Sequence, residues 1–143
     1  MFGVLFSIGE IEDIARAITA YAETDVYVDA ANVVIPDVKQ KTDEGTSYTG
    51  RSFQPYAPSY AKRRRKNNLQ TSRVDLRVTG HLLDNLHLEG DMIVPADEDV
   101  KKAEGLNFGN AHNKMEARPF LGADEATTQK VEETVAQKLE ERL

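Results

Sequence analysis

Five consecutive basic residues near the middle of the chain are its densest group of charged side chains: Lys62, Arg63, Arg64, Arg65 and Lys66. Such a cluster can neutralise several phosphates and bind nucleic acid with an affinity that falls as salt rises. It can equally form a solvated helix face or an electrostatic contact with an acidic protein. We favour the latter two interpretations, because the net charge is −6 and the aromatic-basic alternation typical of single-strand binding stops at Tyr60. DNA binding through this cluster is the alternative.

The three histidines, His81, His87 and His112, are the residues that could bind a catalytic metal together with nearby carboxylates. Their spacing fits no metal-binding motif that we know. The chain has no cysteine, so thiol nucleophiles, thiolate metal sites and disulfides are excluded. It also has neither a Gly-x-Ser-x-Gly elbow nor a phosphate-binding loop. The sequence therefore predicts no metal, no cofactor and no enzymatic activity.

Aromatic side chains on an irregular segment form a second group of candidate contacts, because aromatic residues beside charge are enriched at the centres of interfaces. The candidates for contact with another subunit or a partner are Tyr48, Phe53, Tyr56 and Tyr60. Packing within their own chain is an equally good interpretation. Arg118 and Phe120 are further candidates, but here we favour a structural role, in which Phe120 is buried and Arg118 pairs with a helix end or a carboxylate.

The chain has the size and composition of one folded domain, with 143 residues, 40 % hydrophobic and 29 % charged. Residues 1–143 are therefore predicted to form a single domain. Charge is distributed unevenly: residues 1–50 carry 3 basic and 9 acidic side chains, residues 51–90 carry 8 and 3, and residues 91–143 carry 7 and 12. The balances of −6, +5 and −5 suit docking between copies or contact with an acidic partner.

The start of the chain is apolar but short, lacks a basic flank and runs into Glu10 and Glu12, so it predicts neither a signal peptide nor a membrane span. Apolar residues at spacings of three and four then predict a helix over residues 8–22. Its face consists of Ile11, Ile14, Ala15, Ile18 and Ala22. Thr24 or Asp25 is expected to cap a second helix. Pro36 leaves two interpretations: a kinked helix to about residue 44, which we favour, or an extended stretch before a short helix.

Residues 45–75 are predicted to form an irregular, mobile and basic loop, because two glycines and two prolines between 45 and 60 favour turns. Within it, Ser59 is expected to cap a short basic helix. Further on, Thr79 is expected to cap a helical turn that contains Leu82 and Leu83. Alternation over residues 86–94, broken at Gly90-Asp91, predicts two strands joined by a tight hairpin.

Residues 97–103 are predicted to form one or two helical turns, followed by a loop over 105–113 in which Leu106 and Phe108 anchor into the core. The strongest predicted helix begins near Asp124. Its narrow apolar stripe consists of Val131, Val135 and Leu139. We expect this helix to lie across a sheet or a neighbouring subunit. The predicted fold class is α+β: a small antiparallel β-sheet packed by two or three helices, including a long C-terminal helix.

Three stretches of the chain follow one another in a distinctive order. They are Gly50-Arg-Ser-Phe-Gln-Pro-Tyr-Ala-Pro-Ser-Tyr-Ala-Lys, Val74-Asp-Leu-Arg-Val-Thr-Gly-His-Leu-Leu-Asp-Asn-Leu and Ala117-Arg-Pro-Phe-Leu-Gly-Ala-Asp. In their order and spacing they are similar to the virion-morphogenesis or tail-completion proteins of tailed bacteriophages. The basic cluster is denser than the family pattern requires, and residues 67–72 look like an insertion, so these residues suit partners of one particular phage.

The resemblance implies an α+β structural protein at the neck or tail end of a virion, where it would complete or terminate the tail or join it to the head. It implies no enzymatic activity. The expected partners are further copies of the chain in a homo-oligomeric ring, with a hexamer as one option, the tail tube protein and head-completion or connector proteins. Contact with passing DNA is a further option, and no membrane is involved. The expected location is the virion, and the host cytoplasm during assembly.

Overall fold

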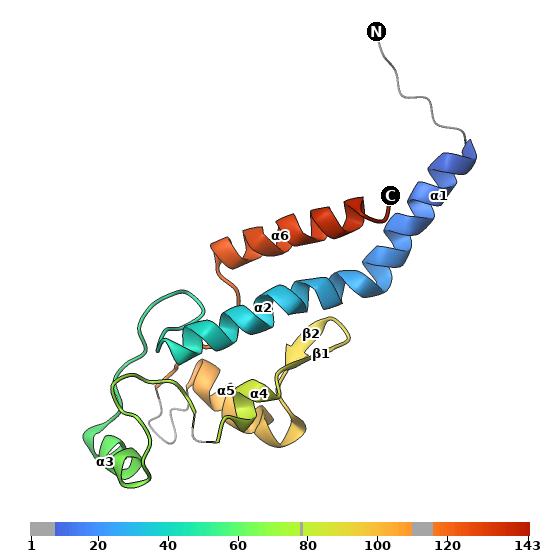
Figure 1. Cartoon of the computed structure of the whole chain (residues 1–143). Coiled ribbons are helices and arrows are strands. Elements are labelled where there is room, and N and C mark those ends of the chain that lie inside the picture. Colours follow the sequence, from blue (N-terminus) through green and yellow to red (C-terminus); the bar gives the residue numbers. More distant parts are fainter. Residues whose placement is uncertain (1–7, 78, 110–115) are drawn as a thin grey trace.

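The computed structural model describes residues 8–77, 79–109 and 116–143 (Figure 1). The elements are α1 (Ile8–Ala20), the π-helical η1 (Tyr21–Asp25), α2 (Val26–Asp43), α3 (Pro58–Lys66), α4 (His81–Asp84), β1 (His87–Glu89), β2 (Met92–Val94), the 3-10 turn η2 (Asp97–Asp99), α5 (Val100–Phe108) and α6 (Glu125–Glu140). The predicted α+β class, with a small antiparallel sheet and a long C-terminal helix, is confirmed.

The first three elements form one helical run whose direction changes between α1 and α2 (Figure 1). A π-helical turn is a known cause of such a bend. Asp25 has helical backbone angles and makes no capping bond, and the Thr24 hydroxyl donates to the Ala20 carbonyl over 3.1 Å. The predicted cap at these residues is wrong, because the chain never leaves the helix. Pro36 lies inside α2, so the extended alternative is wrong as well.

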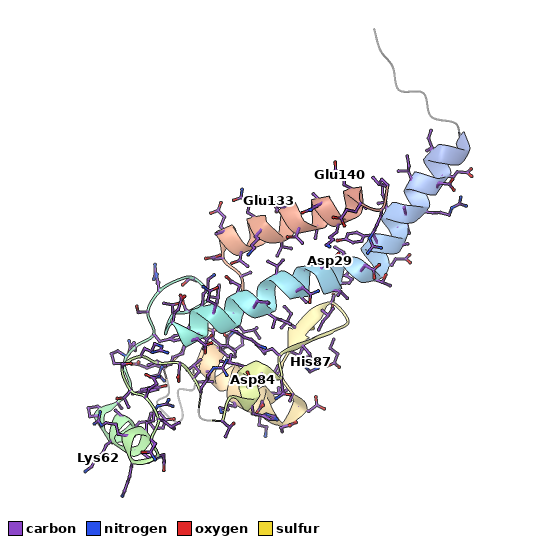
Figure 2. All side chains as sticks on the ribbon, viewed as in Figure 1. Asp29, Lys62, Asp84, His87, Glu133 and Glu140 are labelled. Carbon is purple, nitrogen blue, oxygen red and sulfur yellow. The ribbon has the colours of Figure 1, made fainter. Side chains whose placement is uncertain are left out.

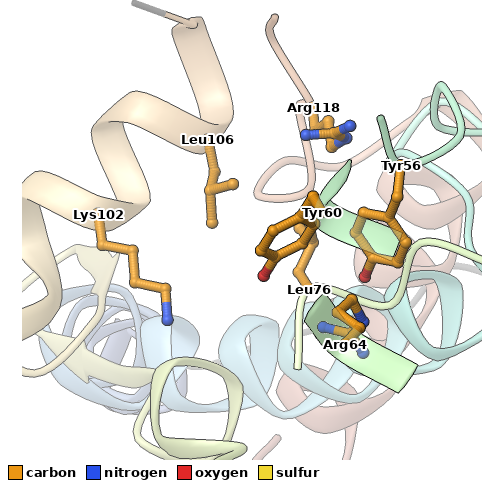
Figure 3. A pocket seen from close by; sticks show the side chains of 7 residues that line it. All are labelled: Tyr56, Tyr60, Arg64, Leu76, Lys102, Leu106 and Arg118. Atoms are coloured by element: carbon orange, nitrogen blue, oxygen red, sulfur yellow. The ribbon is translucent and has the colours of Figure 1, made fainter. Parts of the chain in front are cut away.

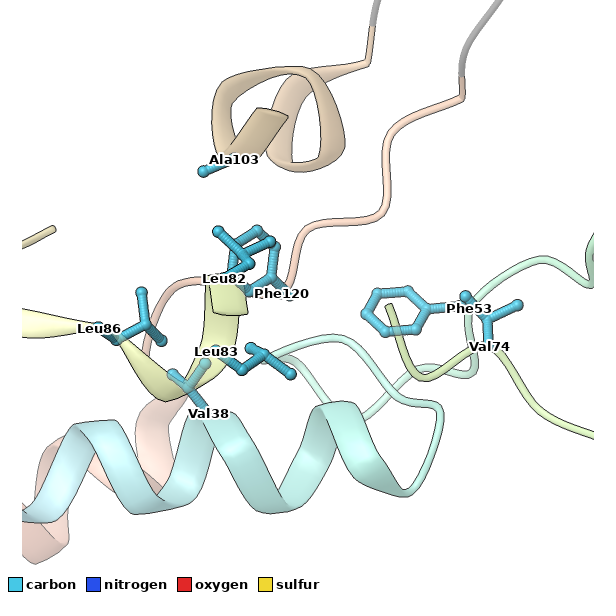
Figure 4. Close-up of a cluster of buried hydrophobic side chains, with 8 residues drawn as sticks. All are labelled: Val38, Phe53, Val74, Leu82, Leu83, Leu86, Ala103 and Phe120. Carbon is cyan, nitrogen blue, oxygen red and sulfur yellow. The ribbon is translucent and has the colours of Figure 1, made fainter. Parts of the chain in front are cut away.

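The hydrophobic core lies against one side of α2 and is completed by segments that are far apart in the sequence (Figure 4). Its buried members are Val38, Phe53, Val74, Leu82, Leu83, Leu86, Ala103 and Phe120. Each fully buried large apolar side chain stabilises the fold by roughly 1.5–3 kcal/mol. All three stretches that carry the family resemblance contribute to this one cluster, which α2 and α5 complete.

The predicted hairpin is confirmed. Strand β1 pairs antiparallel with β2, with His87 opposite Val94, and Gly90 takes the positive φ of 66° that the two-residue turn needs. The residue before α4 is Gly80 and no side chain caps this helix, so the predicted Thr79 cap is wrong, although the Thr79 hydroxyl accepts a hydrogen bond of 3.3 Å from the His81 amide. At α3 the residue before the helix is Ala57. Since Pro58 stands at the first helical position, where a missing N–H costs nothing, the predicted Ser59 cap is wrong.

Helix α5 is longer than predicted and continues to Phe108, so the loop expected from residue 105 is wrong up to that point. Helix propensity is a weak preference that packing overrides, and Leu106 packs against the core as expected, which holds Gly105 in the helix. Phe108 is not an anchor, because 77 % of it is exposed. Residues 110–113 of the predicted loop lie outside the described residues.

Helix α6 runs alongside α2 (Figure 1). The expectation that it crosses a sheet is wrong, because the hairpin is too short to cover a helix of 16 residues. Figure 2 labels Glu133 and Glu140, which are exposed on α6. Asp124 caps the helix by accepting a hydrogen bond of 2.8 Å from the Thr127 amide. None of the helices in the described ranges is long and apolar enough to span a membrane.

Lys41 of α2 is the centre of a polar network beneath the start of α6. Its Nζ lies 2.9 Å from Asp37 and 3.2 Å from Asp124. It also donates to the Thr127 hydroxyl (3.2 Å) and to the Tyr48 carbonyl (3.0 Å). Burial alone would lower the pKa of Lys41, but the hydrogen bonds with Asp37 and Asp124 outweigh burial and raise it. The charged ammonium thus fastens both α6 and the loop at Tyr48 to α2.

The far end of α6 is held by contacts with η1. Arg142 pairs with Asp25 at 2.9 Å, and its guanidinium lies 4.8 Å from the centre of the Tyr21 ring. The Tyr21 hydroxyl donates to Asp29 over 2.9 Å. Burial, together with this carboxylate, raises the pKa of Tyr21 to about 12. Both ends of α6 are therefore fixed by specific polar contacts, and its apolar stripe faces α2 between them.

Candidate partner-binding pocket

The basic cluster does not form one uniform surface, because Arg64 turns inward and is only 2 % exposed. Its Nη2 donates to Asp75 Oδ1 over 3.2 Å and its Nη1 to the Arg77 carbonyl over 3.0 Å. Its Nε donates to the Gln70 carbonyl over 3.1 Å. A buried guanidinium is stable only when its donors are used and its charge is paired. The interpretation of Arg64 as a contact for DNA or an acidic partner is therefore corrected: it ties residues 70–77 to α3.

Tyr56 lies directly on this buried ion pair. The Arg64 guanidinium is 4.6 Å from the centre of the Tyr56 ring. The Tyr56 hydroxyl donates to Asp75 Oδ1 over 3.4 Å and accepts from the Asp75 amide over 3.3 Å. Burial raises the pKa of Tyr56. The Tyr60 ring meets Tyr56 edge to face, with 5.2 Å between the centroids. Both rings are thus held in place by contacts within the chain.

The two tyrosines open onto a pocket of about 340 Å³ (Figure 3). It is lined by Tyr56, Tyr60, Arg64, Leu76, Lys102, Leu106 and Arg118. The walls are therefore aromatic and aliphatic, and the charged groups among the described lining residues are all cationic. A volume near the lower end of the roughly 300–1,000 Å³ range of ligand sites can hold side chains of a partner. The pocket suits an apolar group that stands beside a carboxylate.

Leu76 lines this pocket in a left-handed backbone conformation, with a φ of 56°. For a residue other than glycine this conformation costs on the order of 1–3 kcal/mol and persists only where neighbours hold it. Asp75 Oδ1 accepts a hydrogen bond of 3.0 Å from the Arg77 amide, which spans Leu76 and holds the turn. The same carboxylate oxygen therefore pairs with Arg64 and fixes the pocket wall.

Arg118 closes the pocket at the segment that follows α5. Its Nη2 donates to the Gln54 carbonyl over 3.4 Å, and its guanidinium lies 5.8 Å from the centre of the Tyr56 ring. It therefore pairs with a loop carbonyl and an aromatic ring, where a helix end or a carboxylate was expected. Phe120 is fully buried, in agreement with the structural interpretation.

Tyr48 and Phe53, the other two aromatic candidates, lie within the fold and outside the pocket. The Tyr48 ring packs against Gly122, where an added Cβ would come within 2.8 Å of it. The Tyr48 amide donates to the Pro119 carbonyl over 3.1 Å. Phe53 is 8 % exposed and belongs to the core. The structure thus divides the predicted group of four aromatics into two structural residues and two pocket residues.

The remaining members of the basic cluster form an exposed surface that we call the α3 basic face. It consists of Lys62, Arg63, Arg65 and Lys66. None of them forms an ion pair with another side chain in the part of the chain that the structure describes. Figure 2 places Lys62 at the end of the molecule that is remote from α1. This face lies on the helix that also supplies Tyr60 to the pocket.

The histidines are not brought together. His81 lies 3.3 Å from Glu98 and also contacts Asp99, whereas the His87 Nδ1 lies 2.9 Å from the Asn85 carbonyl oxygen. His112 is outside the described residues. Over residues 8–77, 79–109 and 116–143, no three histidine or acidic side chains are grouped so that they could hold a metal.

Leu76 and Lys102 are pocket residues that sequence reasoning missed. Leu76 stands in the second family-like stretch, which gives it no role in a site, and Lys102 joins the pocket only because α5 packs opposite residues 56–76. Leu106 was expected to face the core and does so, but it also lines the pocket. Comparison of the chain with protein-family models, with curated proteins and with solved structures finds no match.

Proposed function

We propose that this chain is a structural morphogenesis protein of a tailed bacteriophage, which acts at the neck or the tail end by assembling into a ring and docking on the tail tube or the connector. The observation that carries the proposal is the order of the three family-like stretches. All three stretches contribute side chains to one hydrophobic core, and this supports the proposal. If the pattern of the three stretches specifies a fold, their apolar residues should be in contact in that fold. It is a tail-completion, tail-terminating or head-tail joining role, without turnover of a small molecule.

The pocket supports an assembly role in a second way. It is small, cationic and lined by fixed aromatic rings, which are features of a recess that receives side chains of a partner. The acidic and basic regions of the chain also favour contact between copies that meet through different surfaces. Such contacts form a closed ring when the rotations from each copy to the next add up to a full turn.

The test is electron microscopy of lysates from the encoding phage with this gene disrupted. Separate DNA-filled heads and free tails are expected if the protein joins the two, and tails of uncontrolled length are expected if it terminates the tail. Expression of the intact chain from a plasmid should restore whole particles in either case. Normal infectious virions in the disrupted strain would contradict the proposal.

Nucleic-acid binding is the second candidate, and the α3 basic face favours it because four exposed cations stand on one short helix. Replacement of Lys62, Arg63, Arg65 and Lys66 by alanine should then abolish binding to a DNA duplex, while Arg64 is left in place to preserve the fold. The affinity of the intact chain should fall linearly with the logarithm of salt, with a slope of about −0.9 for each phosphate contacted. A salt-independent affinity, or none, would eliminate this candidate.

A further inference from the structure

Helix α1 carries an apolar face that is largely exposed among the described residues. It extends away from the body of the molecule (Figure 1). Ile11 is 53 % exposed and Ile18 is 41 % exposed, and Ile14 lies between them on the same face. Contiguous exposed apolar residues with this spacing are typical of a helix that docks into a groove of a partner.

The charge of α1 is opposite to that of the pocket region. Residues 8–25, which form α1 and η1, contain five acidic residues and one arginine, a balance of −4. Helix α3 carries five basic residues, of which Arg64 is neutralised by Asp75. Glu12 lies about 100° around the helix from Ile11, so it flanks the apolar face. A carboxylate beside an apolar ridge is the chemistry that an apolar pocket with a cationic rim accepts.

One copy cannot join these two surfaces, because α1 and α3 lie at opposite ends of the molecule (Figures 1 and 2). We propose that α1 of one copy docks into the pocket of the next copy. Ile11, Ile14 and Ile18 pack against Tyr60, Leu76 and Leu106 of the neighbour, and Glu12 faces Lys102 and the α3 basic face. This contact is heterologous, so it propagates from copy to copy and can close into a ring. It specifies the surfaces for the ring assembly proposed above and rests on that function.

A second copy is favoured over other occupants by charge. Two α1 helices packed face to face would bring acidic flanks together, and like charges across an interface are unfavourable. Docking of α1 on the pocket pairs opposite signs, so the association should weaken as salt rises. The pocket walls need no rearrangement, since Asp75 and Arg64 already fix Tyr56 and Leu76 within the chain.

Two variants of the full chain separate this arrangement from other modes of association. The helix variant is Ile11→Asp with Ile18→Asp, and the pocket variant is Tyr60→Ala with Lys102→Glu. Met92→Asp, at a residue 62 % exposed on the hairpin, is the control for the first, and Tyr27→Ala with Lys130→Glu is the control for the second. Circular dichroism melting of each variant verifies that it is folded.

Sedimentation over a range of protein concentrations measures the association. The intact chain and both controls should form oligomers. The helix variant and the pocket variant should each be monomeric at the same concentrations, with apparent dissociation constants raised at least about tenfold. An equimolar mixture of the two variants should form dimers that grow no further, because it contains one intact helix surface and one intact pocket for each pair.

Several outcomes would overturn the inference. Association of the pocket variant by itself would show that the contact does not use the pocket. A helix variant that assembles like the intact chain would remove α1 from the interface, and a monomeric intact chain at every soluble concentration would remove the interface altogether. None of these results would alter the particles counted in lysates of the disrupted phage, so the role in morphogenesis is tested separately.

Discussion

Helices α1 and α6 both combine an apolar stripe with charged residues, yet the fold uses them in different ways. The apolar stripe of α6 lies along α2, and its two ends are fixed by Asp124 and Arg142. The stripe of α1 is exposed, and its one described ion pair, between Arg16 and Asp13, is local and solvent-exposed. A local exposed pair contributes little to stability. Helix α6 is thus packed on α2 and fixed at both ends, whereas α1 has no comparable long-range polar contact among the described residues.

The largest difference between the two helices should appear when a charge is placed in the apolar stripe of each. Val135→Asp puts a carboxylate between α6 and α2, and we expect it to lower the free energy of unfolding by roughly 2–4 kcal/mol. Ile18→Asp on α1 should change it by no more than about 0.5 kcal/mol, because surface substitutions have small effects. Urea denaturation at low protein concentration measures both. Equal losses for the two variants would remove the distinction between the helices.

Removal of the cation beneath α6 should have the next largest effect. Lys41→Met leaves Asp37 and Asp124 facing each other without a counter-charge. Since Lys41 is 17 % exposed, we expect a loss of roughly 1–3 kcal/mol, which is less than for a fully buried pair. The double variant Lys41→Met with Asp37→Asn should recover part of this loss. Unchanged thermal stability in Lys41→Met would show that packing alone holds α6.

Tyr21→Phe should have a smaller effect at the opposite end of α6. It removes the hydrogen bond to Asp29 and keeps the ring beneath Arg142. The expected loss is about 0.5–1.5 kcal/mol, the usual range for one hydrogen bond. Tyr27→Phe, at a residue 39 % exposed on α2, is a control and should be neutral. If the two variants prove equally stable in urea, the Tyr21 hydroxyl has no part in holding the junction.

The smallest effect at neutral pH should be that of Asp124→Asn, because asparagine caps a helix about as well as aspartate. The small difference from the intact chain should be present at neutral pH and should narrow in acid. Hydrogen bonds from Thr127, together with Lys41, lower the pKa of Asp124 from 3.8 to about 2. A depressed pKa means that this stabilisation is complete above about pH 4 and is lost as pH falls towards 2. Melting temperatures should therefore show a steeper acid decline in the intact chain than in Asp124→Asn, and parallel declines would contradict this account.

Local sequence patterns predicted the helices and the hairpin well, but they predicted poorly which side chains contact one another in the fold. The spacing of isoleucines predicted α1, the Gly90-Asp91 pair predicted the hairpin, and Asp124 marked the start of α6, because each signal acts over a few residues. The basic cluster was predicted as one surface, since nothing near it shows that Arg64 has a carboxylate partner at Asp75. The length of α5 was underestimated because Gly105 suggested a loop, whereas packing of Leu106 keeps it helical.

By itself the sequence determined where most helices and the hairpin form, that thiol chemistry is absent, and that charge alternates along the chain. Periodicity, turn residues and composition are properties of neighbouring residues, so no fold is needed to read them. The tertiary structure decided that α6 covers α2, that the α1 stripe is exposed, and that two tyrosines, Leu76, Lys102 and Leu106 share one pocket. Burial and pairing depend on which distant segments meet, and only the packed chain brings them together.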